Sequence, residues 1–219
     1  MTRSWGIVVW LLVLAALASL LVRFIPPARA QTGMEPQLSE ILASPSRDWN
    51  GDGIYNARQD EWVEVRNATG GAIDLAAYRI ADADSTIRYE LSGLLAPDAV
   101  LLVMGNMAED QQRAAGRTVT GLSLNNSGDT VLLFRVGAGD TVAVDSYKYG
   151  TIEGGSDRSV GRLGPDGAWA LFDALNKYTG SGQPASTGCP PTPGAANGCP
   201  TPVGATTWGK IKMRFRDGR

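Results

Sequence analysis

The sequence contains no histidine among its 219 residues. This absence excludes Ser-His-Asp and Cys-His nucleophilic systems, and it also excludes histidine-ligated zinc. An enzyme built from this chain would have to rely on carboxylates, tyrosine, lysine or a metal ion that prefers oxygen ligands. The composition therefore narrows the possible chemistry before any motif is considered.

Basic residues are scarce in the body of the chain. Three of the 20 basic residues lie within residues 1–30 and five within residues 210–219, which leaves 12 basic against 21 acidic residues between them. A protein that binds nucleic acid without sequence preference needs a basic surface. We therefore expect no nucleic-acid partner, and the acidic body favours cations and basic or neutral partners.

Long segments with helical spacing of apolar residues are missing after residue 30. Short runs rich in Val, Ile, Leu and Tyr are separated instead by Gly, Asp, Asn and Pro, which is typical of an antiparallel β-sandwich or barrel. We expect strands at 38–44, 61–67, 73–82, 86–92, 99–105, 130–136, 141–149, 159–164 and 167–172, and one helix at 108–116.

Two pairs of these segments predict hairpins. Segments 130–136 and 141–149 flank Gly-Ala-Gly-Asp, and segments 159–164 and 167–172 lie around Pro-Asp-Gly. The segment 99–105 is apolar throughout, so we expect it in the middle of a sheet, covered on both faces.

The first 30 residues differ from the rest of the chain. Arg3 is followed by an apolar run from Trp5 to Val22 and by an Ala-Arg-Ala triplet that ends at Ala30. This order predicts an N-terminal signal helix, cleaved after Ala30, with residues 31–35 as a short linker and a secreted, extracellular or cell-surface location. The alternative is an uncleaved membrane anchor, because the apolar run is nearly long enough to span a bilayer.

The two cysteines, Cys189 and Cys199, lie in a segment rich in Gly, Pro, Ser and Thr. In an oxidising compartment they would form a disulfide that closes a short loop, and two free thiols are the alternative. We expect the folded domain to span residues 36–197. An irregular Pro/Gly linker and a basic amphipathic tail would follow at 198–219.

The segment DWNGDGIYNARQDEW, residues 48–62, places oxygen-bearing side chains at alternate positions before a glycine. Calcium prefers several oxygen ligands, and calcium loops begin with this spacing. Gln59 stands where a helix-loop-helix site has a bidentate glutamate, so a closing carboxylate would come one or two residues later. The predicted calcium ligands are Asp48, Asn50, Asp52, the main-chain carbonyl of Ile54, Asp60 and Glu61.

Two other interpretations of this segment stay open. One is a polar turn without a metal, because Asp and Asn side chains stabilise turns by themselves. The other is an active site for acid–base chemistry, which needs two carboxylates that converge on a cleft. Nothing in the sequence shows that Asp60, Glu61 and Glu64 converge. We therefore expect a structural calcium site and no catalytic residues.

Residues 208–216 alternate apolar and basic side chains, which predicts a two-faced strand. The candidate contact residues are Trp208, Lys210, Lys212, Arg214 and Arg216. This tail would add a strand to the sandwich or to a partner's sheet, contact an anionic surface such as lipid head groups, or act as a sorting signal. A disordered basic end is the alternative.

Three segments of the chain are distinctive when taken in order. They are residues 39–82, GLSLNNSGDTVLLF at 121–134 and PPTPGAAN at 190–197. In this order they resemble the lamin tail domain family of the bacterial secreted type. The resemblance implies an all-β, immunoglobulin-like antiparallel β-sandwich with a binding or assembly role and no catalytic residues.

We therefore expect a non-enzymatic, calcium-stabilised module that acts outside the cell or at its surface. Its expected partner is a cell-envelope or extracellular protein or glycan. A membrane contact would involve only the signal segment or the basic tail. The alternatives are a carboxylate- or metal-dependent secreted hydrolase and a carbohydrate-binding module, a role that β-sandwiches often have.

Overall fold

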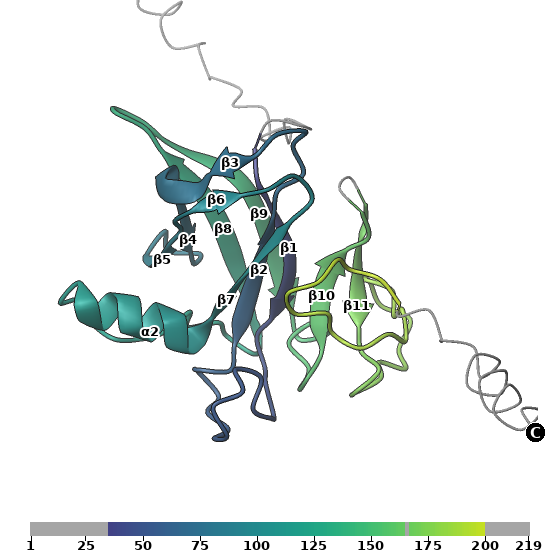
Figure 1. The fold of residues 1–219 in the computed structure, drawn as a ribbon. Helices are drawn as coiled ribbons and strands as arrows, with labels where there is room; N and C mark the ends of the chain where they lie inside the picture. Colours follow the sequence, from purple (N-terminus) through teal and green to yellow (C-terminus); the bar gives the residue numbers. More distant parts are fainter. Residues whose placement is uncertain (1–34, 165–166, 200–219) are drawn as a thin grey trace, which may run out of the picture. The chain divides into compact units, whose positions relative to one another are not determined.

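The computed structural model describes residues 35–164 and 167–199. Its strands form two main sheets and one two-stranded sheet (Figure 1). In chain order the elements are β1 (Gln37–Leu42), β2 (Trp62–Arg66), β3 (Ile73–Asp74), η1 (Leu75–Ala77), β4 (Tyr78–Ala81), β5 (Ile87–Glu90), β6 (Leu94–Leu95), β7 (Val100–Met104), α2 (Gly105–Ala114), β8 (Gly128–Val136), β9 (Thr141–Gly150), β10 (Ser159–Arg162) and β11 (Trp169–Phe172). The predicted signal helix and basic tail lie outside the described residues.

The two main sheets pack face to face as an immunoglobulin-like β-sandwich, as predicted. The five-stranded sheet has the order β11-β10-β1-β2-β7, and the four-stranded sheet has the order β5-β4-β8-β9. Neighbouring strands are antiparallel in both sheets. The β8–β9 and β10–β11 hairpins confirm the two hairpin predictions.

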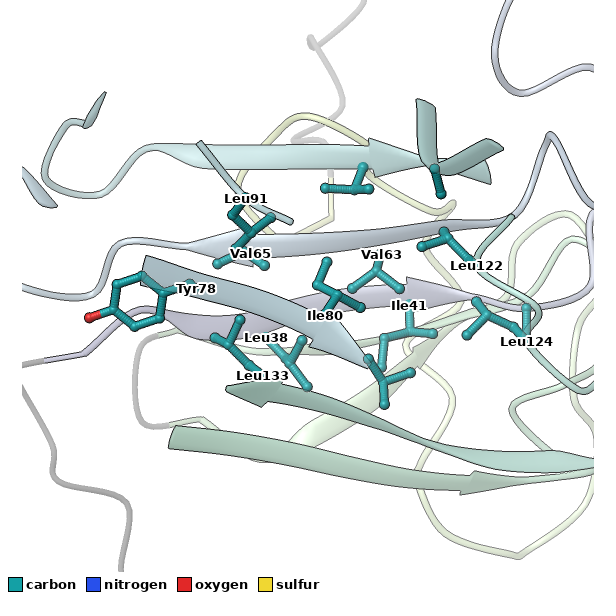
Figure 2. Close-up of a cluster of buried hydrophobic side chains, with 14 of the residues drawn as sticks. Leu38, Ile41, Val63, Val65, Tyr78, Ile80, Leu91, Leu122, Leu124 and Leu133 are labelled. Carbon is teal, nitrogen blue, oxygen red and sulfur yellow. The ribbon is translucent and has the colours of Figure 1, made fainter. Parts of the chain in front are cut away.

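Alternation along the strands places apolar side chains between the sheets (Figure 2). Val63 and Val65 of β2 share one buried cluster with Ile80 of β4 and Leu133 of β8, and none of the four is more than 1% exposed. Burial of one such side chain contributes about 1.5 to 3 kcal/mol to stability. The intervening residues of β2, Trp62 and Glu64, therefore lie on the outer face of the sheet.

An irregularity in β1 determines which of its side chains enter the core. The register of β1 against β2 shifts between Leu38 and Glu40. Leu38 and Ile41 both belong to the core cluster, although strict alternation would put them on opposite faces. Glu40 pairs with Glu64 across the strands and lies with it on the outer face.

Two predicted strands differ from the structure. The segment 73–82 is interrupted by η1, because the Asp74 side chain accepts a hydrogen bond from the amide of Ala76 at 3.0 Å and turns the chain. The central position predicted for 99–105 is wrong, since β7 is an edge strand. Its apolar character on the outer face is explained by a second cluster, in which Leu102 packs with Trp49 and Trp62.

The helix α2 begins three residues before the predicted start. Its first residue is Gly105, where a Cβ would lie 1.8 Å from the carbonyl oxygen of Arg58, so the backbones approach too closely for any other residue. Gln111 of α2 exchanges two hydrogen bonds with the backbone of Glu90, which covers the edge of β5. Neither helix in the described part of the chain is long and apolar enough to cross a membrane.

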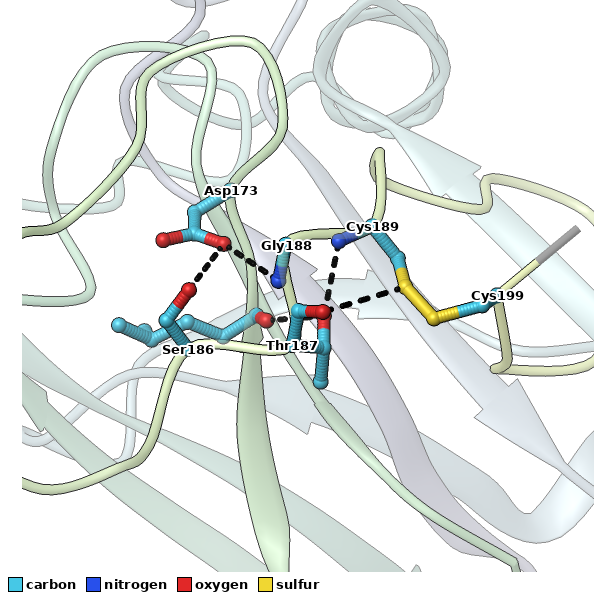
Figure 3. Close-up of a disulfide and its surroundings, with 7 residues drawn as sticks. Asp173, Ser186, Thr187, Gly188, Cys189 and Cys199 are labelled. Carbon is cyan, nitrogen blue, oxygen red and sulfur yellow. Dashed lines mark hydrogen bonds between the residues drawn. A yellow bond between two sulfur atoms is a disulfide. The ribbon is translucent and has the colours of Figure 1, made fainter.

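Residues 189–199, here called the C-terminal strap, are closed by the predicted disulfide between Cys189 and Cys199 (Figure 3). The segment before the strap is fixed to the end of β11. Asp173 accepts hydrogen bonds from the hydroxyl of Ser186 at 2.8 Å and from the amide of Gly188 at 3.1 Å. These hydrogen bonds fix the backbone just before Cys189, the first cysteine of the disulfide.

The strap covers the two outward-facing glutamates of the five-stranded sheet. Thr192 donates its hydroxyl and amide hydrogens to Glu40, and the amide of Gly194 donates to Glu64 at 2.8 Å. Both carboxyl groups are fully buried, and burial raises the pKa of Glu40 and raises that of Glu64 to about 7. The strap is therefore part of the folded domain.

We predict that replacing Cys189 and Cys199 together with serine lowers the free energy of unfolding by about 2 to 3 kcal/mol, because the short loop is then unconstrained in the unfolded chain. Urea denaturation followed by tryptophan fluorescence measures this loss. A reductant should destabilise the wild-type protein equally and leave the double variant unchanged. Equal stability of the oxidised and reduced wild-type protein would contradict the prediction.

Candidate functional site

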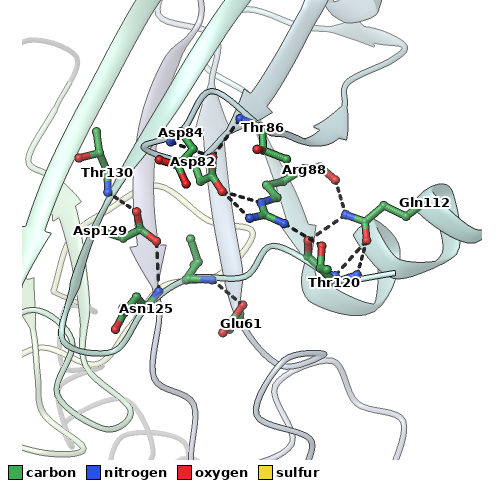
Figure 4. A network of polar contacts seen from close by, with 12 residues as sticks. Glu61, Asp82, Asp84, Thr86, Arg88, Gln112, Thr120, Asn125, Asp129 and Thr130 are labelled. Atoms are coloured by element: carbon green, nitrogen blue, oxygen red, sulfur yellow. Dashed lines mark hydrogen bonds and ion pairs between the residues drawn. The ribbon is translucent and has the colours of Figure 1, made fainter. Parts of the chain in front are cut away.

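A polar cleft of about 420 Å³ opens beside the start of β2. Three parts of the chain line it: the segment that leads into β2, the β4–β5 hairpin, and the segment 123–129 before and at the start of β8 (Figure 4). Its lining residues are Arg58, Glu61, Asp82, Ala83, Asp84, Arg88, Ser123, Leu124, Asn125, Gly128 and Asp129. Most of them are polar or charged.

Among the acidic residues that line this cleft, Glu61 is the most buried one that forms no ion pair with an arginine. It is 5% exposed, and its Oε2 accepts a hydrogen bond from the amide of Leu124 at 3.1 Å. Burial raises its pKa to about 8, although the charges of Arg58 and Arg88 act in the opposite direction. The carboxyl group is therefore mostly protonated at neutral pH.

Asp82 and Arg88 form the wall contributed by the β4–β5 hairpin. Asp82 receives two hydrogen bonds from the Arg88 guanidinium, and its other oxygen accepts from the amides of Asp84 and Thr86 (Figure 4). Arg88 also donates to the hydroxyl of Thr120 at 2.8 Å. Each charge of this buried pair is thus balanced by the other.

Gln112 of α2 links the β4–β5 hairpin to residues 120–121, which come just before the segment 123–129 that lines the cleft. Its side-chain amide donates to the carbonyl oxygens of Arg88 and Gly121, and its oxygen accepts from the amides of Thr120 and Gly121. The residue is only 2% exposed. A buried amide with both ends satisfied fixes the spacing between the elements that it joins.

The segment 123–129 makes a tight turn. The amide of Gly128 donates to the carbonyl oxygen of Asn125 at 3.0 Å, and Asp129 accepts from the amides of Asn125 and Thr130. Gly128 has a φ of 131°, and a Cβ there would lie 2.9 Å from the carbonyl oxygen of Tyr149. Only glycine fits this position without a shift of the backbone.

Tyr149 adds a buried hydroxyl close to these carboxylates. Its hydroxyl oxygen has no hydrogen-bond partner among the described residues, and the residue is 3% exposed. Burial raises its pKa, and the negative charges of Asp129 and Glu61 raise it further. Tyr149 is therefore near Asp129 and Glu61, although it is not among the residues that line the cleft.

The predicted calcium loop lies outside this cleft. Asp48 accepts hydrogen bonds from the amides of Gly51 at 2.6 Å and Gly53 at 2.7 Å. Further along, the side-chain oxygens of Asn50 and Asp52 each accept from the amide two residues later. These oxygens keep further acceptor capacity, since a carboxylate accepts up to about four hydrogen bonds or metal contacts. Three of the predicted ligands thus share one loop with the carbonyl of Ile54.

Asp60 and Glu61 occupy different positions from these three. Asp60 is fully buried, and its carboxylate accepts from the amides of Trp49, Asn50 and Asn56 at 2.7 to 2.9 Å. It holds the loop from inside, while Glu61 faces the cleft. Across residues 35–164 and 167–199, no three His, Cys, Asp or Glu side chains gather closely enough to hold a metal ion. The calcium set stays a prediction.

Asp157 is a buried anchor that the sequence analysis missed. It accepts hydrogen bonds from Ser46, from the guanidinium of Arg47 and from the indole of Trp49. Burial tends to raise its pKa, but these hydrogen bonds outweigh burial and lower it. No local motif indicates this role, because the partners lie more than 100 positions away in sequence.

The described residues thus form an immunoglobulin-like β-sandwich that carries a polar cleft beside β2. The family model of the Lamin Tail Domain matches residues 30–151, and the chain belongs to this family. The match ends before β10, β11 and the strap, which complete the same five-stranded sheet. No match was found among curated proteins or solved structures. The predicted contact residues Trp208, Lys210, Lys212, Arg214 and Arg216 lie outside the described residues.

We predict that Glu61→Gln flattens the pH dependence of stability. The pKa of Glu61 is raised from 4.5 to about 8 on folding, so its stabilising contribution is complete below pH 4.5 and is lost as the pH rises towards 8. The free energy of unfolding of the wild-type protein should fall by up to about 1.4 kcal/mol per pH unit in this window through this group alone.

Urea denaturation at a series of pH values between 4 and 9 tests this prediction, and Glu64→Gln provides a matched variant. Its effect should be confined to the range below about pH 7, where the pKa of Glu64 lies. Parallel stability curves for the wild type and Glu61→Gln would show that Glu61 titrates normally.

Proposed function

We propose that the chain is an exported binding or assembly module, without enzymatic activity, that works outside the cell or at its surface. Membership in the lamin tail domain family makes it a module of the binding or assembly type. The disulfide supports export, because such bonds persist in oxidising compartments. The proposal names a cell-envelope or extracellular protein or glycan as the partner.

The single observation that carries this proposal is the cleft beside β2. Its walls are built from side chains that are already hydrogen-bonded to one another, as in the pair Asp82–Arg88. Pre-organised polar groups of this kind suit recognition, because little order has to be gained on binding. Asp82 and Asp129 use their oxygens to hold backbone amides of the cleft walls.

A carboxylate-dependent hydrolase is the second candidate. The observation in its favour is Glu61, a buried carboxyl group with a raised pKa in a cleft, which is a feature of many general acids. A carbohydrate-binding module has less support, since none of the residues that line the cleft is aromatic and sugars commonly stack on aromatic rings.

Two measurements on the purified chain separate these functions. Retention on cell-envelope fractions, extracellular proteins or immobilised glycans is the expected outcome, with no turnover of generic phosphoester or glycoside substrates. Turnover that disappears in Glu61→Gln would favour the hydrolase instead. Absence of both retention and turnover would leave the binding proposal refuted for these partners.

We also propose that the loop beginning at Asp48 binds calcium outside the cell. The support is the alternate placement of Asp48, Asn50 and Asp52 in one loop, together with the carbonyl of Ile54. Because no three acidic side chains meet in the described residues, water and amide oxygens would complete the ion's shell. Asp60 would hold the backbone beneath it.

We predict that about 10 mM calcium raises the melting temperature by several degrees and that a chelator reverses the rise, as expected for a dissociation constant of about 0.1 to 1 mM. Asp52→Asn should abolish most of the shift, because it removes a charge that the ion would neutralise. Asp110→Asn on the exposed face of α2 is the control. An unchanged melting temperature of the wild-type protein in calcium would refute the site.

A further inference from the structure

Part of the hydrogen-bonding capacity of the cleft is unused. Glu61 is buried and lines the cleft, yet its Oε1 accepts no hydrogen bond from any described residue. Asp84 lines the cleft from an exposed position, and its carboxylate also accepts none. Asp129 accepts one amide on each oxygen and can accept more. Three carboxylates therefore have acceptor sites open to a guest.

A buried tyrosine lies near these carboxylates, although it is not among the residues that line the cleft. Burial and the negative charges of Asp129 and Glu61 raise the pKa of Tyr149, while the backbone of Asn125 acts in the opposite direction. Tyr149 thus belongs to the surroundings of the carboxylates, and the open acceptor sites are those of Glu61, Asp84 and Asp129.

The charge balance of the cleft determines the sign of this guest. Arg88 is neutralised by Asp82, and Arg58 forms no ion pair with any described residue. Asp84 and Asp129 outnumber Arg58, so the open groups carry an excess of negative charge even when Glu61 is protonated. A positively charged guest is favoured by about 1 kcal/mol or more for each close carboxylate.

The spacing of the carboxylates suits a cation that carries several hydrogen-bond donors. No three acidic side chains in the described ranges are close enough to share a metal. A guanidinium has five N–H donors in a plane and an ammonium has three, so either group can reach acceptors that are farther apart. The volume of about 420 Å³ accommodates the end of one long side chain and part of its backbone.

We propose that this cleft binds the cationic end of a lysine or arginine side chain carried by a peptide segment. The inference rests on the proposed binding function and gives its ligand a chemical class. Two sources offer this chemistry. One is the basic segment 208–216 of this same chain, and the other is a separate protein.

The binding experiment uses the full chain and a fluorescently labelled peptide with the sequence of residues 208–216. Fluorescence anisotropy should show saturable binding that is lost when the four basic residues of the peptide are replaced with glutamine. Asp84→Asn should weaken binding about tenfold, because it removes an open carboxylate. Glu61→Gln should also weaken binding, because an amide at this position cannot ionise beside the bound cation. Asp110→Asn, which lies outside the cleft, should change it less than twofold.

Asp84→Asn keeps the test informative if Glu61→Gln affects folding, since the side chain of Asp84 is exposed and makes no hydrogen bond with any described residue. Binding that is equal in the wild type and in Asp84→Asn and Asp110→Asn would overturn the proposal. The absence of binding up to about 1 mM peptide would also overturn it, if binding is absent as well from a chain whose own basic residues at 210–216 are replaced with glutamine. Envelope retention together with peptide binding that is unaffected by Glu61→Gln and Asp84→Asn would keep the proposed function and overturn this inference alone.

A second chain identifies the source of the cation. In it Lys210, Lys212, Arg214 and Arg216 are replaced with glutamine while the rest of the sequence is kept. If the chain's own tail fills the cleft, this variant should bind the labelled peptide several-fold more tightly than the wild type, because the internal competitor is gone. Equal affinity assigns the site to a separate protein, and retention on envelope protein should then fall in Asp84→Asn.

Discussion

Every carboxylate that is buried at the start of β2 must find hydrogen-bond donors, because an unpaired charge in a protein interior costs several kcal/mol. Asp60, Glu61 and Glu64 lie within five residues and satisfy this need in three directions. Asp60 takes amides of the loop before β2, Glu61 takes an amide of the segment 123–129, and Glu64 takes one from the strap. Residues 60–64 therefore hold three separate segments: the loop before β2, the segment 123–129 and the strap.

This arrangement separates the parts of the protein that hold the fold from those that are free to bind. The amides that serve Asp60 keep the loop in place from inside, so the side chains of Asp48 and Asp52 remain outside it. In the cleft, Asp82 and Arg88 complete each other, which leaves Glu61 and its neighbours as the groups with capacity to spare. Most charged groups of this lamin tail domain thus hold the frame together, and only a few polar groups keep acceptor capacity for a ligand.

The sequence predicts local features of this protein well and distant ones poorly. Alternation in 61–67 places Val63 and Val65 in the core, and the turn residues around 137–140 predict the β8–β9 hairpin. The edge position of β7 was mispredicted because apolar residues on both faces are also produced by a small external cluster such as that of Trp49 and Leu102. The separation of Glu61 from the calcium loop, and the anchoring by Asp157, depend on partners that are 63 and more than 100 positions away, so no spacing rule detects them.

The strap has a consequence for the order in which the molecule is completed. The side-chain amide of Asn197 donates to the carbonyl oxygen of Ser39 at 2.9 Å, across 158 positions of sequence. In the same strap, Thr192 donates to Glu40 of β1 and Gly194 donates to Glu64 of β2. Because a polypeptide is synthesised from its N-terminus, the outer face of the five-stranded sheet stays exposed to water until residues 189–199 have been made. A chain that stops before the strap would therefore leave Glu40 and Glu64 without these hydrogen-bond donors, so the sandwich is complete only when the strap is in place.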